Sequence, residues 1–170
     1  LRESKALIID LDSTHADTYG QQEFTAYNTH YGTVGFHPLV AFDGITGDFL
    51  KAQLRPGNVY TSNGVVDFVE PLIKHYNENF PETTPFLRGD SGFAVPALYD
   101  LCERESVYYV IRLKSNAILQ RMADECHPVT VPSDVTKSEC YYEEIDYQAK
   151  SWSMPRKVII QSVRPAGELL

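Results

Sequence analysis

The sequence predicts an α/β domain in which a meander of three antiparallel strands is continued by parallel strands. Two observations predict this fold class. Three strand-like segments, at 5–14, 36–44 and 49–57, follow one another without a helix between them. From residue 62 onward, segments with the apolar spacing of helices alternate with short β-branched or aromatic runs. Strands that follow one another directly favour antiparallel pairing, whereas strands separated by helices favour parallel pairing.

The first strand-like segment, KALIIDLDST (5–14), is a short apolar run that ends in acids and hydroxyls. This pattern indicates a buried strand whose carboxyl end carries function. Strand alternation places Asp10 and Asp12 on one face of this strand. It places the following apolar side chains on the other face: Leu7, Ile9 and Leu11.

Composition and apolar spacing predict the secondary structure of the segments after the first strand. Residues 15–35 are rich in Gly, Thr, Asn and Tyr, so we expect a long hairpin connection there. Apolar spacing predicts helices, which would span 62–80, 94–105 and 116–126. Pro71 is an objection to the first helix because an interior Pro costs about 3 kcal/mol, so a kink or a late start stays open. The remaining segments are expected to be strands at 84–90, 106–115, 139–149 and 156–165, with a loop at 127–138.

The first eight elements have the order β-β-β-α-β-α-β-α, which matches a ribonuclease H-like plan with a mixed sheet. Right-handed crossovers would place the strand at 5–12 beside the strand at 84–90. Asp12 and Asp90 would then lie at neighbouring carboxyl ends, the edge where sites form in open α/β sheets. We expect residues 1–125 to form this core and residues 126–170 to begin a β-rich insertion.

Composition restricts the class of protein. The 170 residues are 43% hydrophobic, which favours a globular chain, and no apolar run approaches the length of a membrane span. An odd number of cysteines without CxxC spacing suits reduced thiols in a cytoplasm. The net charge of −8 is unusual for a DNA-binding domain that acts alone. If the substrate is nucleic acid, we expect most phosphate contacts in other parts of a longer parent protein, of which this chain would be a piece. Alternatively, bound cations offset part of the negative charge.

Two carboxylates at adjacent strand ends suit a divalent metal. Mg²⁺ binds a few carboxylates together with waters and phosphate oxygens, and two such ions ~3.5–4 Å apart can support phosphodiester chemistry. The alternative is that Asp12 and Asp90 only stabilise turns, which is common for Asp at strand ends. Asp10 could reach the same ion as Asp12, or it could bond a neighbouring strand or helix end, because a partly buried carboxylate needs a partner.

Several motifs occur in order over roughly residues 5 to 120: IDLDST, TYGQQE, YGTVGFHPLVAFDGITGDFLKAQLRPGN, FLRGDSGF and YYVIRLKSN. As an ordered set they resemble the DDE transposases of bacterial insertion sequences, in particular the cut-and-paste group with a transposase DDE domain. The resemblance implies that Asp12 is the first metal ligand and Asp90 the second. It implies a third ligand, a Glu on a later helix beyond an inserted β-rich region.

The third ligand is where this chain departs from the family pattern. Nothing in 126–170 has the pattern of that helix, and Glu143 and Glu144 lie in a segment that alternates like a strand. We therefore expect the catalytic Glu beyond Leu170, in a longer parent protein. The fragment is then expected to bind metal weakly and to be inactive alone.

By resemblance, the parent is an endonuclease and strand transferase that cuts double-stranded DNA at transposon ends and joins the freed 3′-hydroxyl to target DNA. The resemblance also implies two Mg²⁺ or Mn²⁺ ions, a dimer in the active complex, and a place in the bacterial cytoplasm with the nucleoid. The alternative is an inactive, domesticated transposase domain that serves as a DNA-binding or assembly module.

Four polar residues are candidates for DNA contact. Arg88 could pair with a carboxylate or with a DNA phosphate. Arg112 and Lys114 alternate on the predicted fifth strand and, with Asn116, could touch DNA or form a solvated face. Arg88-Gly89-Asp90 also spells the tripeptide that adhesion receptors bind, although the odd number of cysteines speaks against an extracellular protein.

Overall fold

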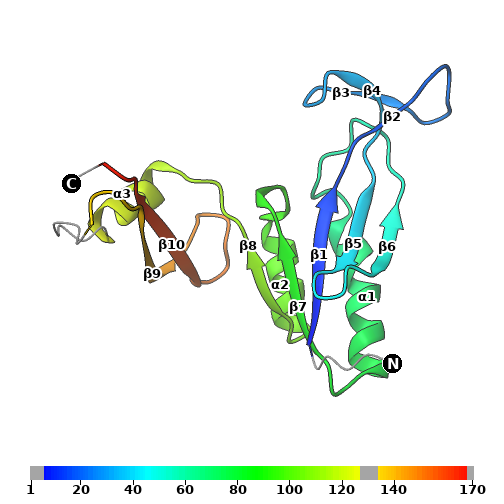
Figure 1. Ribbon diagram of the computed structural model, residues 1–170. Coiled ribbons are helices and arrows are strands. Elements are labelled where there is room, and N and C mark those ends of the chain that lie inside the picture. The colour runs from blue at the N-terminus through cyan, green and yellow to red at the C-terminus, as the bar shows by residue number, and fades with distance from the viewer. Residues whose placement is uncertain (1–5, 127–133, 168–170) are drawn as a thin grey trace. The chain divides into compact units, whose positions relative to one another are not determined.

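The computed structural model describes residues 6–126 and 134–167, and the chain forms two compact units (Figure 1). The first unit ends at Leu113 and the second begins at Lys114. The third predicted helix, Ala117–Cys126 (α3), belongs to the second unit. The predicted domain boundary after residue 125 stays a prediction.

The first unit contains a five-stranded mixed sheet. Its strands are β1 (Ala6–Ser13), β5 (Leu39–Asp43), β6 (Phe49–Gln53), β7 (Thr84–Gly89) and β8 (Tyr108–Ile111). The order in the sheet is β6-β5-β1-β7-β8, with β6, β5 and β1 antiparallel and β1, β7 and β8 parallel. The predicted antiparallel meander and the predicted neighbours β1 and β7 are thus confirmed.

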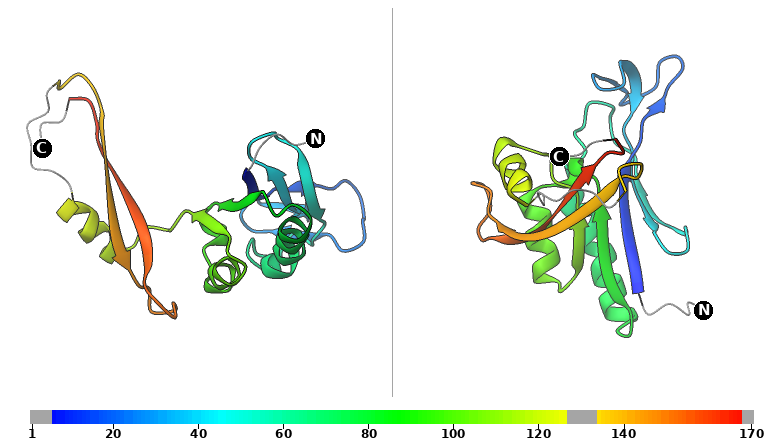
Figure 2. Two further views of the ribbon diagram at one scale, coloured as in Figure 1. Left: turned by 90° about the horizontal axis from the view of Figure 1, so that it is seen from below. Right: turned by 60° about the vertical axis from the view of Figure 1, so that its left-hand side comes forward.

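Helices α1 (Val65–Asn79) and α2 (Pro96–Arg104) cover one face of this sheet (Figure 2). The buried side chains of β1 lie on that face, as the alternation predicted: Leu7, Ile9 and Leu11. They share a core with apolar side chains of both helices, including Ile73 and Leu98. Each such side chain contributes about 1.5–3 kcal/mol when it is fully buried, so burial on this face stabilises the unit.

Helix α1 tolerates a proline in its interior. The helix begins at Val65, later than predicted, yet Pro71 still lies within it. Val65, Phe68, Val69 and Ile73 are all buried against the sheet. Their burial outweighs the cost of about 3 kcal/mol for an interior Pro.

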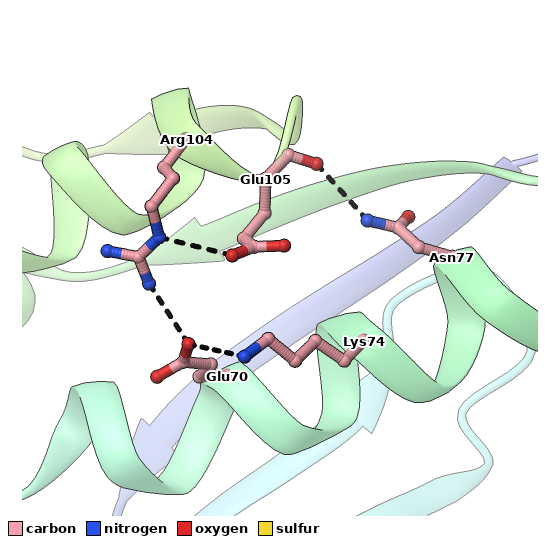
Figure 3. Close-up of polar contacts among 5 residues, drawn as sticks. All are labelled: Glu70, Lys74, Asn77, Arg104 and Glu105. Carbon is pink, nitrogen blue, oxygen red and sulfur yellow. Dashed lines mark hydrogen bonds and ion pairs between the residues drawn. The ribbon is translucent and has the colours of Figure 1, made fainter.

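Polar contacts join the two helices (Figure 3). Glu70 of α1 accepts from Lys74 at 2.8 Å and from Arg104 of α2 at 3.0 Å. Arg104 also donates to Glu105 at 3.1 Å, and Asn77 donates to the Glu105 carbonyl at 3.1 Å. The hydrogen bond from Lys74 lowers the pKa of Glu70 below its ordinary value. Lys74 and Arg104 are exposed and their acidic partners are partly exposed, so these contacts align the helices more than they stabilise them.

Two features of the first unit differ in detail from the prediction. Residues 15–35 connect the antiparallel neighbours β1 and β5, as predicted, but they also contain a small sheet that the sequence did not predict. Its strands are β2 (Ala16–Asp17), β3 (Ala26–Asn28) and β4 (Thr33–Phe36), in the order β2-β4-β3. The fifth strand is also shorter than predicted. Ser106 has a left-handed backbone (φ 58°) that prevents an earlier start, and the pairing with β7 ends at Gly89 and Ile111.

In the second unit, the two predicted strands are present as β9 (Glu139–Tyr147) and β10 (Arg156–Arg164), and they form an antiparallel pair. Glu143 and Glu144 therefore lie on a strand and not on a helix. Residues 127–133 of the predicted loop lie outside the described residues. In the described part of the chain, no helix combines the length and the apolar character that a membrane crossing requires.

The free thiols Cys102 and Cys140 differ sharply in environment. Cys102 is fully buried in the core, where burial raises the pKa of its thiol to about 12, whereas Cys140 is exposed on β9. Because only thiolate is reactive, we expect iodoacetamide at mildly alkaline pH to modify Cys140 in the folded chain and to spare Cys102. Peptide mass spectrometry before and after denaturation in urea measures this, and rapid modification of Cys102 in the folded state would contradict it.

Candidate metal site at the carboxyl ends of β1 and β7

Strands β1 and β7 end side by side, and each end carries an aspartate. Asp10 is the partner of Arg88 in the parallel register. The pairing ends there, and Asp12 and Asp90 each follow two residues later in their own segments. Asp90 keeps an extended backbone (φ −77°, ψ −176°), so its side chain emerges on the same face as that of Arg88. Asp12 and Asp90 therefore follow the last paired residues of the two strands at the same end of the sheet.

Asp90 stabilises the turn that follows β7. One of its oxygens, Oδ1, accepts from the Gly92 amide at 2.8 Å, which caps a short 3₁₀ turn over Ser91–Phe93. Gly92 is required for close approach, because a Cβ there would lie 2.8 Å from Thr61 Cγ2 and 3.0 Å from Asp90 Oδ1. The turn-stabilising role considered from the sequence is thus real for Asp90, but it uses only one carboxylate oxygen.

Asp12 has a similar local environment on an exposed stretch of β1. Its Oδ1 accepts from the Ser13 amide at 2.7 Å. The Ser13 hydroxyl lies 3.2 Å from the Thr61 hydroxyl, and the Thr14 amide donates to the Pro38 carbonyl at 3.2 Å. The backbone after Asp12 is therefore held from two sides, while the carboxylate stays accessible to solvent.

Asp10 is paired with Arg88. Both nitrogens of the guanidinium fork take part, with Nε donating to Oδ1 at 3.0 Å and Nη2 donating to Oδ2. This contact raises the pKa of Arg88 above its ordinary value. The partner that a half-buried Asp10 requires is therefore Arg88, and both oxygens of Asp10 are already engaged. From the sequence, Arg88 could pair with a carboxylate or with a DNA phosphate. In the structure it pairs with the carboxylate of Asp10.

The chemistry of the donors at the two strand ends fits a hard divalent cation. Within the described residues, no hydrogen bond engages Oδ2 of either Asp12 or Asp90. Mg²⁺ and Mn²⁺ favour carboxylate oxygens, with waters and phosphate oxygens completing the coordination. The described part of the chain holds no group of three or more His, Cys, Asp or Glu that could bind a metal ion. The two aspartates thus offer part of a site.

The predicted DNA-contacting residues are not grouped on one strand. Arg112 and Lys114 lie beyond the end of β8 at Ile111, so their predicted position on the strand is wrong. Both are exposed, and Lys114 begins the second unit. Asn116 caps α3, because its Oδ1 accepts from the amides of Ile118 and Leu119 at 3.0 Å each.

Sequence reasoning missed the loop that contains Thr61. This residue touches Ser13 through its hydroxyl and approaches Gly92 through its methyl group, so it lies between the turns that follow Asp12 and Asp90. The only available signal was Arg55 in QLRPGN, a charged residue placed between a strand and a Pro-Gly turn.

The model of a family described as transposase DDE domain group 1 matches residues 1–170. No curated protein matches the sequence. A similar solved structure is the cryo-EM structure of the piggyBac transposase synaptic complex with hairpin DNA, at 17% identity and a TM-score of 0.48. That match covers 90% of this chain and 32% of the piggyBac chain, so this chain spans about a third of that protein.

Proposed function

Because the chain belongs to the transposase DDE domain group 1 family, we propose that Asp12 and Asp90 are carboxylate ligands of a divalent metal site for DNA cleavage and strand transfer. The observation that carries this proposal is the parallel register of β1 and β7, which brings both aspartates to the same end and face of the sheet. The strand order β6-β5-β1-β7-β8 also supports a ribonuclease H-like core.

Each residue of the site has a distinct task in this proposal. Asp12 and Asp90 present their Oδ2 atoms, while the Ser13 and Gly92 amides hold the Oδ1 atoms and fix the orientation of both carboxylates. Arg88 neutralises Asp10 two residues deeper in the sheet. When bound, two Mg²⁺ or Mn²⁺ ions would activate the attacking oxygen, first of water and then of a 3′-hydroxyl, and stabilise the leaving oxygen.

The third acidic ligand belongs to the proposal as well. Glu143 and Glu144 lie on β9, and Glu144 pairs with Lys157 at 3.1 Å. We place the third ligand outside these 170 residues, so that this chain binds metal weakly and does not cleave DNA alone. The partners are double-stranded transposon ends and target DNA, bound by a dimer in the bacterial cytoplasm. Arg112 and Lys114 are exposed and remain candidates for phosphate contact.

The position of bound Mn²⁺ tests this proposal. Mn²⁺ is added to the ¹⁵N-labelled chain, and the paramagnetic broadening of each backbone amide signal is followed by NMR. We expect the amides of Ser13 and Gly92 to broaden at the lowest Mn²⁺ concentrations, and EDTA to restore them. Broadening spread evenly over the acidic surface would overturn the metal site. DNA binding without Mn²⁺ binding would favour the inactive DNA-binding or assembly module.

A further inference from the structure

Arg55 is a buried cation close to the candidate site. It follows β6 by two residues, and only 5% of its surface is exposed. Its guanidinium donates only to backbone carbonyls in the contacts that the structure contains. Burial lowers the pKa of the guanidinium from its ordinary value. A buried charge is costly unless it is hydrogen-bonded, and these carbonyls compensate for part of the lost hydration, while Nη2 has no hydrogen-bond partner among the described residues.

The carbonyls that Arg55 binds come from two segments. Nε donates to the His37 carbonyl at 3.0 Å, just before β5. Nη1 donates to the carbonyls of Thr61 at 3.1 Å and Asn63 at 2.9 Å, with a longer contact of 3.4 Å to Tyr60. The planar guanidinium thus holds the loop over residues 60–63 and links it by hydrogen bonds to the segment just before β5. A lysine has no such fork and cannot reproduce this arrangement.

The 60–63 loop contacts residues next to both aspartates of the candidate site. The Thr61 hydroxyl lies 3.2 Å from the Ser13 hydroxyl, next to Asp12. The Thr61 methyl packs so closely on Gly92 that a Cβ at this glycine would lie 2.8 Å from it. Ser13 and Gly92 are also the residues whose amides hold the carboxylates of Asp12 and Asp90. Thr61 therefore contacts both residues that orient the two aspartates.

We propose that Arg55 is a positioning residue that sets the spacing of Asp12 and Asp90 through Thr61. The guanidinium fixes the 60–63 loop, the loop places Thr61 between the two turns, and the turns orient the carboxylates. The role of this spacing in metal binding rests on the proposed function. The positioning itself does not, because it can be observed without metal.

The test compares three variants of the ¹⁵N-labelled chain without metal. Arg55→Lys keeps the charge but loses the fork, and Thr61→Ala removes both contacts of Thr61 while leaving Arg55 in place. Thr61→Ser keeps the hydroxyl and removes the methyl group. The matched control is Arg104→Lys, which alters an exposed guanidinium between α1 and α2 (Figure 3).

We expect Arg55→Lys to move the amide signals of both Ser13 and Gly92, neither of which Arg55 contacts. Thr61→Ala should move the same two signals, whereas Thr61→Ser should move that of Gly92 and leave that of Ser13 in place. Arg104→Lys should move neither. Mn²⁺ affinity should fall about tenfold in Arg55→Lys and Thr61→Ala, as is typical when outer residues that orient metal ligands are changed.

Unchanged Ser13 and Gly92 signals in Thr61→Ala overturn the inference, even if Arg55→Lys fails to fold. Moved signals with an unchanged Mn²⁺ affinity overturn the role of this spacing in metal binding, although they support the positioning of Ser13 and Gly92 by Arg55. If the unaltered chain binds no Mn²⁺ at these residues, the proposed function fails, and the metal-free signals still decide whether Arg55 acts through Thr61.

Discussion

Replacing Asp12 or Asp90 with Asn is expected to weaken Mn²⁺ binding at least about tenfold, which corresponds to about 1.4 kcal/mol. Asn keeps a side-chain carbonyl at the Oδ1 position, so it can still accept from the Ser13 or Gly92 amide that each aspartate now binds. It loses the negative charge and replaces Oδ2, the oxygen offered to the metal, with an NH₂ group that cannot bind a cation. A purely turn-stabilising aspartate would tolerate this change, whereas a metal ligand would not.

The same substitutions should leave the free energy of unfolding unchanged or raise it. Two like charges at adjacent strand ends repel each other, so removing one relieves the repulsion when no metal is present. Isothermal titration with Mn²⁺ and urea denaturation measure the two quantities. The control is Asp48→Asn, because Asp48 also accepts a hydrogen bond in an exposed turn, from Thr46 at 2.8 Å, but lies after β5 and not at the end of β1 or β7. Equal Mn²⁺ affinity in all three variants would contradict the metal site.

The arrangement of β1 and β7 was predictable because two strong physical rules apply to it. Alternation along β1 separates Leu7, Ile9 and Leu11 from the acids, and all three are buried. The handedness of crossovers then makes β1 and β7 neighbours. Both rules depend only on the residue types of the local segment and on chain connectivity, so they can be applied to a single sequence.

Other features were not predictable because they depend on contacts between distant segments. The length of β8 is set by where its partner β7 ends, so Arg112 appeared to continue a strand that stops at Ile111. The strands of the small β2-β4-β3 sheet are two to four residues long, too short for alternation to identify. Thr61 carries no signal of its own, since its importance comes from Ser13, 48 residues away, and from Gly92.

Replacing Phe93 with Ala is expected to lower the free energy of unfolding of the first unit by about 3–5 kcal/mol, the usual cost of removing a buried Phe. Phe93 is fully buried and is the largest such side chain in the described chain. It lies beneath the Asp90 turn, where its ring and Cβ would come within 3.1–3.4 Å of a Cβ at Gly89. Its removal leaves a cavity between the end of β7 and the helices, in a core that is otherwise closely packed.

Phe49→Ala is the matched control, because 62% of Phe49 is exposed and its closest aromatic neighbour is Phe42. It should cost less than about 1 kcal/mol, as surface substitutions usually do. Amide hydrogen exchange at Leu7 and Ile9 reports on the first unit, while the fluorescence of Trp152, the single tryptophan, reports on the second. Faster exchange at Leu7 and Ile9 in Phe93→Ala, with an unshifted Trp152 transition, is the expected result. Equal exchange in the two variants would show that Phe93 does not anchor the Asp90 turn to the core.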